Sequence, residues 1–456
     1  MMKHMTLENI CIACSGTYYG PSENFTKEVE GITIDSRKAE TGWLFAATVG
    51  ERVDGHSFME SCYAKGVLCC LGEKTPVSEN VSYIQVGSTF QALKDIAEYY
   101  RSTLQIPVVG ITGSVGKTST KEMIASVLSV KYNTLKTAGN FNNEVGLPLT
   151  VFNIREEHEA AVLEMGISDF GEMHRLSKIA RPNICVITNI GFCHLEFLGD
   201  RDGVLRAKSE IFDFASKGFQ AIANGDDDKL QTLRSRDDLD CTFFGMEPSN
   251  DVYAKHVENL GLDGLKCEIS TPVGDFGAHI HIPGMHMVYN ALAGTCVGLA
   301  CGLTLDEIKS GIENAQTISG RNNLIHTKYY TIMDDCYNAI PGSMKASLDV
   351  LSTALGKTVA ILGDMGELGT NERALHYTVG EHAAKKHIDL LLCVGTLSEE
   401  IVKGALSVNP DMKALLFKTK EKLLEQLPEL LNKGDSILVK ASHFMQFDKI
   451  VKALED

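Results

Sequence analysis

The sequence predicts an α/β protein in which parallel sheets are covered by helices on both faces. Short apolar runs, most of them ending at Gly, Asn or Asp, alternate along the chain with segments of helical period. This alternation is typical of parallel sheets whose strands are joined by helical crossovers. With 456 residues, the chain is long enough for two to four domains, and we expect three.

Eight apolar runs are candidate buried strands. They cover residues 108–111, 160–163, 185–189, 221–223, 332–335, 359–362, 390–394 and 437–439. A helix is predicted after Pro341, because Met344, Leu348, Leu351 and Leu355 recur at helical spacing.

Two changes of pattern suggest domain boundaries. A new sheet begins at residues 106–108, and a second break is expected at residues 316–320, between a helical region and a strand-like one. The predicted domains therefore cover residues 1–100, 101–317 and 318–456.

The composition excludes several classes of protein. Hydrophobic residues make up 44% of the chain and charged residues 22%, which is ordinary globular usage rather than that of a disordered or fibrous chain. The formal net charge of −16 repels polyphosphate backbones at long range, so no nucleic-acid partner is expected.

The cysteines and the apolar runs indicate the compartment. Thirteen cysteines are scattered through the chain, which does not resemble a disulfide framework and fits a reducing cytoplasm. No run of about 18 apolar residues occurs, and Glu8 and Asn9 interrupt the place where a signal peptide needs an apolar core. We therefore expect a cytoplasmic protein without stable membrane insertion.

The strongest motif is a glycine-rich loop between a predicted strand and a predicted helix. It reads Thr112-Gly-Ser-Val-Gly-Lys-Thr118 and departs from the strict phosphate-loop pattern because Ile111 stands where the first Gly belongs. Backbone N–H groups in such a turn wrap a polyphosphate, while Lys117 reaches its outer phosphates and the Thr118 hydroxyl reaches Mg²⁺. The sequence therefore predicts a nucleotide site.

Residues that suit a metal site follow neighbouring strands of the same predicted sheet. Glu164 ends one strand, and His194 comes five residues after another. In a doubly wound sheet the carboxyl ends of the strands are where a metal shell would be built. By propensity alone, Lys208 is an exposed helix lysine and the segment 137–144, with three Asn in four residues, is a polar loop.

Together these segments resemble the Mur ligase family of ATP-dependent amide-bond-forming enzymes, in family order along almost the whole chain. The segments cover residues 34–37, 50–56, 112–118, 137–148, 164–166, 194–196, 207–211, 319–321, 334–339, 342–344 and 363–369. The Asn-Phe-Asn-Asn and Asp-Asp-Cys-Tyr-Asn-Ala segments favour the member of the family that adds a D-Ala-D-Ala dipeptide.

The resemblance implies a three-domain architecture and an activity. The N-terminal domain would bind a UDP-linked substrate, the centre would be a P-loop ATPase-like parallel sheet, and a Rossmann-like C-terminal domain would bind the amino substrate. ATP, with Mg²⁺, would phosphorylate the terminal carboxylate of UDP-MurNAc-tripeptide, and the amine of D-Ala-D-Ala would attack the acyl phosphate. A monomer is expected.

The resemblance also assigns roles to residues. ATP would be bound by Thr112, Gly113, Ser114, Val115, Gly116, Lys117, Thr118, Ser119, Asn290, Arg321 and Asp335. Mg²⁺ would be held by Thr118, Glu164, His194 and Lys208, the last as a carbamate formed with CO₂, and catalysis would depend on Lys117, Glu164, His194 and Lys208. Substrate contacts would come from Asp35, Ser36, Asn140, Asn142, Asn143 and Asn338.

Three departures from the family pattern are clustered outside the phosphate loop. Met287 follows His286 where the family has an Asn before the adenine helix, and the other two put the acceptor pocket in doubt. Ile340 replaces an Asn, and His443 replaces an Arg, which exchanges a permanent charge for an imidazole that is mostly neutral at pH 7. Two alternatives follow. One is another Mur-type or folylpolyglutamate-type ligase with a different acceptor, and the other is a nucleotide-binding relative that does not ligate.

Overall fold

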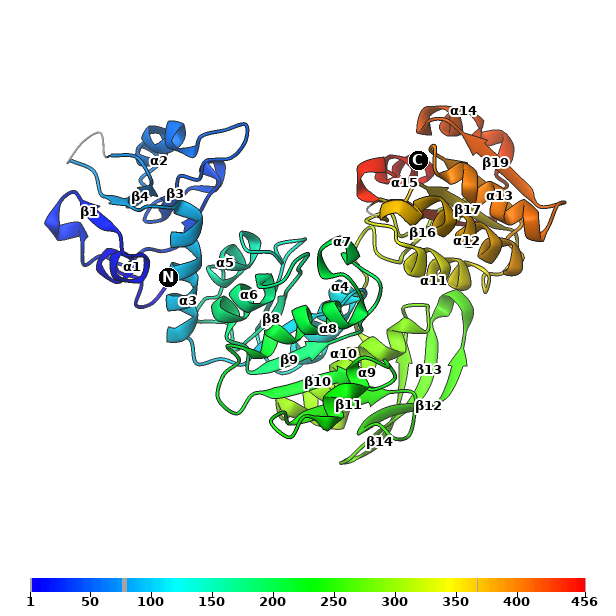
Figure 1. Cartoon of the computed structure of the whole chain (residues 1–456), viewed down its shortest axis with the longest axis horizontal. Coiled ribbons are helices and arrows are strands. Elements are labelled where there is room, and N and C mark those ends of the chain that lie inside the picture. Colours follow the sequence, from blue (N-terminus) through cyan, green and yellow to red (C-terminus); the bar gives the residue numbers. More distant parts are fainter. Residues whose placement is uncertain (1, 76–79, 367, 456) are drawn as a thin grey trace. The chain divides into compact units, whose positions relative to one another are not determined.

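The computed structural model describes residues 2–75, 80–366 and 368–455, and the chain divides into two compact units. Unit 1 comprises Met1–Asp251 with Ala293–Ile308, and unit 2 comprises Val252–Leu292 with Lys309–Asp456. Figure 1 colours the chain from blue at the N-terminus to red at the C-terminus and labels many of the elements.

Unit 1 begins with a small mixed sheet in the strand order β1-β5-β4-β3-β2, in which β1 is antiparallel to β5 and the other pairs are parallel. Its elements are α1 (Leu7–Cys14), β1 (Thr17–Tyr19), β2 (Ile32–Thr33), β3 (Leu44–Ala46), α2 (Met59–Ala64), β4 (Cys69–Gly72), β5 (Tyr83–Gln85) and α3 (Thr89–Thr103). One hydrophobic cluster extends from α1 through α3 into the central sheet, so this part shares its core with the rest of the unit.

The central sheet contributes six parallel strands to unit 1, in the order β11-β10-β9-β6-β8-β7. The strands are β6 (Val108–Thr112), β7 (Thr134–Lys136), β8 (Ala160–Glu164), β9 (Ile184–Ile187), β10 (Gln220–Asn224) and β11 (Cys241–Gly245). Strands β6, β8 and β9 are buried along their whole length, as expected of strands covered on both faces. The four strands predicted in this region are confirmed.

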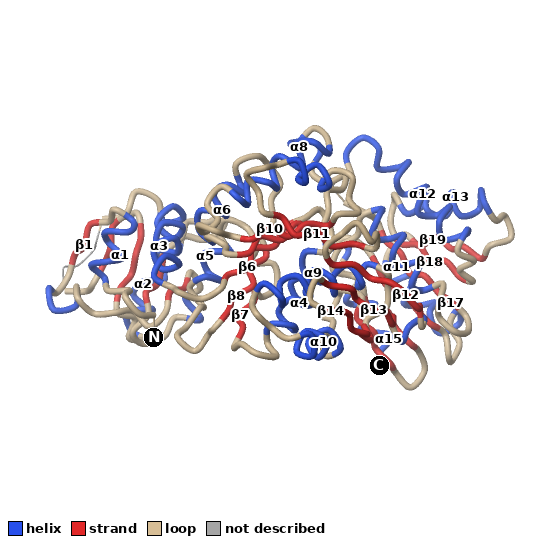
Figure 2. The backbone as a smooth tube through the Cα atoms, turned by 90° about the horizontal axis from the view of Figure 1, so that it is seen from below, coloured by secondary structure: helices blue, strands red, loops and turns tan. Residues whose placement is uncertain are grey.

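Helices cover both faces of the central sheet. Figure 2 shows α6 (Glu172–Ala180) and α8 (Arg201–Ser209) above the strands and α4 (Lys117–Leu128) below them. The shorter helices are α5 (Gly146–Val151) and α7 (Leu195–Leu198), and the chain also forms α9 (His286–Ala300) and α10 (Leu305–Glu313). The loops that leave the carboxyl ends of the strands are therefore free to build a site.

A buried arginine on α3 bonds to the C-terminal end of α6 and to the residue that precedes β9. Arg101 Nε donates to the carbonyl of Ala180 at 2.8 Å, and its two Nη atoms donate to the carbonyls of Leu104 and Arg181, both at 3.0 Å, and to Asn183 Oδ1 at 3.1 Å. Burial, with the nearby charge of Arg181, lowers the pKa of Arg101 to about 10. The carbonyls at the C-terminal ends of two helices thus take the place of a carboxylate partner.

Unit 2 contains an antiparallel meander and a second α/β sheet. The meander is β12 (Val252–Asn259), β13 (Leu265–Thr271) and β14 (Gly274–Ile280). The sheet has the order β15-β16-β20-β17-β18-β19, with β15 antiparallel to β16 and the other pairs parallel.

The strands of this second sheet are β15 (Asn323–His326), β16 (Thr331–Asp334), β17 (Thr358–Gly363), β18 (Leu390–Val394), β19 (Lys413–Phe417) and β20 (Ser436–Lys440), and its helices are α11 (Pro341–Leu351), α12 (Glu372–Lys385), α13 (Ser398–Val408), α14 (Lys420–Leu430) and α15 (Asp448–Glu455). The four strands predicted here are confirmed as well. Hydrophobic clusters lie on both faces of the sheet, so this part of the chain is also a layered α/β fold.

One prediction about a helix is wrong at its end. The helix that begins at Pro341 ends at Leu351, and Leu355, which the spacing placed on its apolar face, is 92% exposed. Residues 352–357 form turns that lead into β17, and this local turn structure overrides the helical spacing. The domain boundaries at residues 100 and 317 stay predictions. Within the described ranges, no helix is both long and apolar enough to cross a membrane.

Replacing Arg101 with Met should destabilise the protein by about 2–4 kcal/mol, because buried helix-end carbonyls lose their donors. Urea unfolding followed by circular dichroism measures this change. The control is Arg37→Met, which removes an arginine whose side chain is 87% exposed and should change stability by less than about 0.5 kcal/mol. Equal stability of the two variants would contradict the assigned role of Arg101.

Candidate functional site

The glycine-rich loop lies between β6 and α4, where the sequence placed it. Gly113 has φ +155°, and a Cβ there would lie 1.9 Å from Thr188 Oγ1, so the loop can pass β9 at this distance because the residue is glycine. Gly116 has φ +78° and directly precedes α4. The first-turn amides of α4 have no carbonyl one turn earlier, so they can receive an anion. Lys117 Nζ donates to the carbonyl of Gly113 at 2.8 Å, which holds its charge over the loop.

The segment after β9 fixes the tip of this loop. The amide of Val115 donates to Asn189 Oδ1 at 3.0 Å, and Asn189 Nδ2 donates to the carbonyl of Val115 at 2.9 Å. The amide of Ser114 donates to the carbonyl of Asn189 at 3.0 Å, and the amide of Gly191 donates to Ser114 Oγ at 2.8 Å. The loop is therefore held in shape by protein groups.

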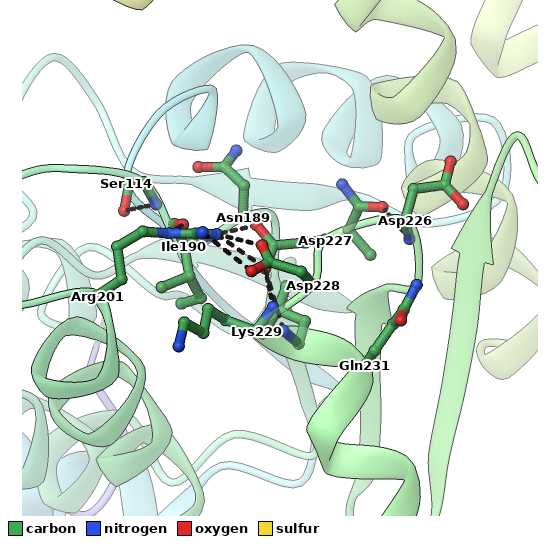
Figure 3. Close-up of polar contacts among 12 residues, drawn as sticks. Ser114, Asn189, Ile190, Arg201, Asp226, Asp227, Asp228, Lys229 and Gln231 are labelled. Carbon is green, nitrogen blue, oxygen red and sulfur yellow. Dashed lines mark hydrogen bonds and ion pairs between the residues drawn. The ribbon is translucent and has the colours of Figure 1, made fainter.

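Two aspartates and an arginine hold the segment after β9 in turn, as Figure 3 shows. The amide of Ile190 donates to Asp227 Oδ2 at 2.8 Å, and Arg201 Nε donates to the carbonyl of Ile190 at 2.9 Å. Arg201 also pairs with Asp228 through both Nη atoms, and this pairing raises the pKa of Arg201. His194 follows on the same segment, so its backbone starts from a fixed point.

Glu164 lies at the carboxyl end of β8, beside the end of β6, and is 2% exposed. Its Oε1 accepts a hydrogen bond from Asn142 Nδ2 at 2.8 Å, and its amide donates to Thr137 Oγ1 at 2.9 Å. In the described ranges, its Oε2 and the Thr112 hydroxyl are buried without hydrogen-bond partners. Buried oxygens at two neighbouring strand ends are suitable ligands for a hard cation, so the residues present fit Mg²⁺.

His194 and Lys208 are the two further groups that the sequence singled out. His194 has φ +51° and directly precedes α7, with its ring partly exposed. Lys208 is on α8, is 1% exposed, and has no ion pair within the described residues. Burial, with the charge of Lys117, lowers the pKa of Lys208 to about 7. An amine with this pKa is substantially neutral at physiological pH.

The asparagines of segment 137–144 differ in their surroundings. Asn142 contacts Glu164, as described, and Asn140 is exposed. Asn143 Oδ1 accepts from the amides of Val145 and Gly146, so this residue positions the start of α5.

The candidates in the first hundred residues lie in a turn at the end of β2. Asp35 caps the turn, and hydrogen bonds from Arg37 lower the pKa of its carboxyl to about 2. The carbonyl of Ser36 accepts from Lys65 Nζ at 2.7 Å.

Unit 2 contains the remaining candidates, Asn290, Arg321, Asp335 and Asn338. Asp335 is held by the buried Lys440, whose Nζ is 2.5 Å from its Oδ2, and by the hydroxyl of Ser347 at 2.6 Å. The Arg321 guanidinium lies over the ring of Tyr337, 4.0 Å from its centroid. Asn290 is buried on α9, and Asn338 Oδ1 accepts from the amide of Ala339.

Three family models match the chain in succession. They are described as Mur ligase family, catalytic domain (residues 28–109), Mur ligase middle domain (111–298), and Mur ligase, glutamate ligase domain (320–443). The UDP-N-acetylmuramoyl-tripeptide–D-alanyl-D-alanine ligase of Bacillus subtilis is 37% identical over 98% of both chains. The chain belongs to the Mur ligase family. This confirms the resemblance and the three-part α/β architecture.

Solved structures of other proteins support the assignment of this chain to the Mur ligase family. A crystal structure of MurF from Acinetobacter baumannii matches with a TM-score of 0.89 and 33% identity, covering 99% of this chain and 98% of that one. MurF from Thermotoga maritima in complex with ADP matches with a TM-score of 0.81 and 30% identity, covering 93% of this chain and 97% of that one.

Three residues that help to form the site of this Mur ligase were not identified from its sequence. Asn189 was assigned only as the end of a strand, and Lys121 and Arg201 were not singled out. A polar residue directly after a strand, and a lysine one helical turn after Lys117, are the signals that could have found the first two. The contact between Arg201 and Ile190 depends on the folded chain, and nothing in the local sequence indicates it.

Replacing Asn189 with Ala should weaken ADP binding by about 5- to 30-fold, because both side-chain hydrogen bonds that hold Val115 are lost. Isothermal titration with ADP and Mg²⁺ measures the dissociation constant. Asn153→Ala is the control, since the exposed Asn153 side-chain amide donates only to the carbonyl of Leu149 among the hydrogen bonds of the described residues. An unchanged dissociation constant in a folded Asn189→Ala protein would show that the loop holds its shape without this side chain.

Proposed function

We propose that this chain is an ATP-dependent ligase that joins D-Ala-D-Ala to UDP-MurNAc-tripeptide and so forms the UDP-MurNAc-pentapeptide precursor of peptidoglycan. The observation that carries the proposal is the phosphate loop beside a buried Glu164 oxygen that has no hydrogen bond in the described ranges, in a chain that matches D-Ala-D-Ala-adding ligases over nearly its full length. Each of the three parts of the chain has a role in this proposal.

Residues 1–100 bind the UDP end of the substrate, with Asp35 and Ser36 near the uridine. Residues 101–317 bind ATP, and residues 318–456 bind the dipeptide and contact the nucleotide. Asn140, Asn143 and Asn338 complete the substrate contacts, and Asn290, Arg321 and Asp335 complete those to the nucleotide. The carbonyl of Ser36 and the carboxylate of Asp335 already have protein partners, which supports roles that depend on fixed positions.

The first step transfers the γ-phosphoryl group of ATP to the terminal carboxylate of the tripeptide, giving an acyl phosphate and ADP. The α4 amides of Lys117, Thr118 and Ser119 and the ammonium of Lys117 stabilise the charge that develops on the transferred group. Thr118, Glu164 and His194 would hold Mg²⁺, which would supply positive charge to neutralise the phosphates. Asn142 keeps Glu164 oriented for this role.

In the second step the amine of D-Ala-D-Ala attacks the acyl carbon and loses a proton, and phosphate leaves as the amide forms. The acyl phosphate reacts with water, so the bound substrates must be shielded from solvent before transfer. Of the two departures that concern the acceptor, Ile340 directly precedes α11, and the centroid of the His443 ring lies 5.6 Å from that of Tyr337. Both departures leave the phosphate loop and Glu164 unchanged.

Lys208 is carbamylated in this proposal. Only a neutral amine attacks CO₂, and the low pKa of the buried Lys208 supplies that form near neutral pH. As the N–C bond forms, the nitrogen releases a proton to solvent, so the carbamate carries a negative charge and two oxygens. A repulsive neighbour of Lys117 would thereby become an attractive one and a ligand for Mg²⁺.

A monomer in the cytoplasm completes the proposal. Both ATP and the UDP-linked precursor belong to that compartment, and all thirteen cysteines are free thiols in the structure.

Phosphate release from ATP with Mg²⁺ should require both UDP-MurNAc-tripeptide and D-Ala-D-Ala, and mass spectrometry should detect the pentapeptide. Lys117→Ala should reduce kcat/KM by on the order of 100-fold or more, because the charge over the loop is lost. Lys131→Ala, an exposed lysine beyond α4, is the control and should remain active. Ligation by Lys117→Ala within tenfold of the parent, about 1.4 kcal/mol of barrier, would refute this role. If the protein bound nucleotide but formed no pentapeptide, the proposal that D-Ala-D-Ala is its acceptor would be wrong.

Carbamylation of Lys208 should rise through pH 7 at fixed dissolved CO₂. Its pKa of about 7 means that the amine is protonated and unreactive at lower pH, half neutral near pH 7 and roughly 90% neutral at pH 8. ¹³C NMR of protein equilibrated with ¹³CO₂ from pH 6 to pH 9 measures the carbamate, and Lys208→Met supplies the blank. A carbamate signal that appears only above pH 9, as for an exposed lysine, would contradict the proposal.

A further inference from the structure

A second lysine lies beside the candidate metal ligand and has no role in the chemistry described so far. Lys121 is on α4, one turn after Lys117, and is 1% exposed. Its Nζ donates to the carbonyl of Thr137 at 2.7 Å and lies 3.0 Å from Glu122 Oε1. Oε2 of Glu164, which has no hydrogen-bond partner in the described ranges, lies 3.9 Å from the same ammonium.

The distances show that the Lys121 ammonium is held by one set of groups and attracts another. Thr137 and Glu122 fix its position, since both lie within hydrogen-bond distance. Glu164 Oε2, at 3.9 Å, is too far for a hydrogen bond but close enough for strong attraction in a buried setting. The position of Lys121 therefore does not depend on Glu164, and the carboxylate oxygen can accept a metal without displacing the lysine.

Without bound nucleotide, the positive charge of the lysines near Glu164 disfavours binding of a metal cation at its carboxylate. Lys117 and Lys121 both lie at this edge of the sheet, and Glu122 is shared between Lys121 and the half-exposed Lys136. Within the described ranges, no group of three or more His, Cys, Asp or Glu side chains could hold a metal ion. When Lys208 is not carbamylated, a divalent cation at Glu164 thus meets one carboxylate with an ammonium beside it, and the phosphates of a nucleotide would supply the missing negative charge.

We propose that Lys121 is a positioning residue that makes divalent-metal binding at Glu164 depend on bound nucleotide. Without nucleotide, the fixed ammonium balances the Glu164 carboxylate and repels a free cation. With nucleotide, the phosphates outweigh this repulsion, and Glu164 would then hold the metal. This inference rests on the proposed function, which places the metal at Glu164.

Mn²⁺ serves as the probe, and its binding to the full chain is measured by electron paramagnetic resonance in CO₂-free buffer at pH 8, with and without a non-hydrolysable ATP analogue. Lys121→Met removes the charge at nearly constant length, and Lys121→Arg retains it. Lys136→Met is the matched control, because Lys136 pairs with the same Glu122 but does not contact Glu164. Thermal melting establishes that each variant is folded.

The parent, Lys121→Arg and Lys136→Met should bind Mn²⁺ weakly without nucleotide, whereas Lys121→Met should bind it at least tenfold more tightly. With the ATP analogue, this difference should shrink to less than threefold. Equal or weaker nucleotide-free binding by a folded Lys121→Met protein would overturn the proposal, and so would tight binding by Lys121→Arg.

Glu164→Gln distinguishes a failure of this inference from a failure of the proposed metal site. Loss of nucleotide-dependent Mn²⁺ binding in Glu164→Gln, with no change in Lys121→Met, would refute the role of Lys121 alone. Retained binding in Glu164→Gln would refute the assignment of the metal to Glu164, and the inference with it.

Discussion

The clasp between Asn189 and the phosphate loop is the constraint on which the rest of the site depends. A loop built from Gly113 and Gly116 has little intrinsic preference for one shape, so its order must come from neighbours. Asn189 supplies it by pairing with the amide and the carbonyl of Val115, while Asp227 and Arg201 hold the backbone that follows Asn189. The ordering is thereby completed during folding, and a nucleotide binds to a preformed cradle.

The site also reconciles an acidic protein with an anionic ligand. The chain carries a formal net charge of −16, yet Lys117, Lys121 and Lys208 lie around one edge of a single sheet. The local charge is adjustable, because burial leaves Lys208 near neutrality and Lys121 is balanced by carboxylates. Such a site changes its net charge with its ligands, whereas the surrounding surface does not.

Local chemistry explains what the sequence could predict. The loop, the start of α4 and the eight strands follow from contiguous patterns, and the substitution at Ile111 did not obscure them. Leu355 misled the helix assignment because spacing does not register where a turn begins. The partners of Glu164, and the contacts of Asn189 and Arg201, join segments 20 or more residues apart in most cases, so they depend on strand order. The roles of the site residues beyond these contacts stay predictions.

The position of Arg101 shows that β9 connects α3 to the phosphate loop. Arg101 on α3 is bonded to Asn183, the residue directly before β9, and the residues directly after β9 end in Asn189, which holds the loop. The strand itself is four residues long, so only a short buried segment separates the contact of Asn183 from that of Asn189. The contacts of α3 and the shape of the phosphate loop therefore both depend on where this one buried strand lies.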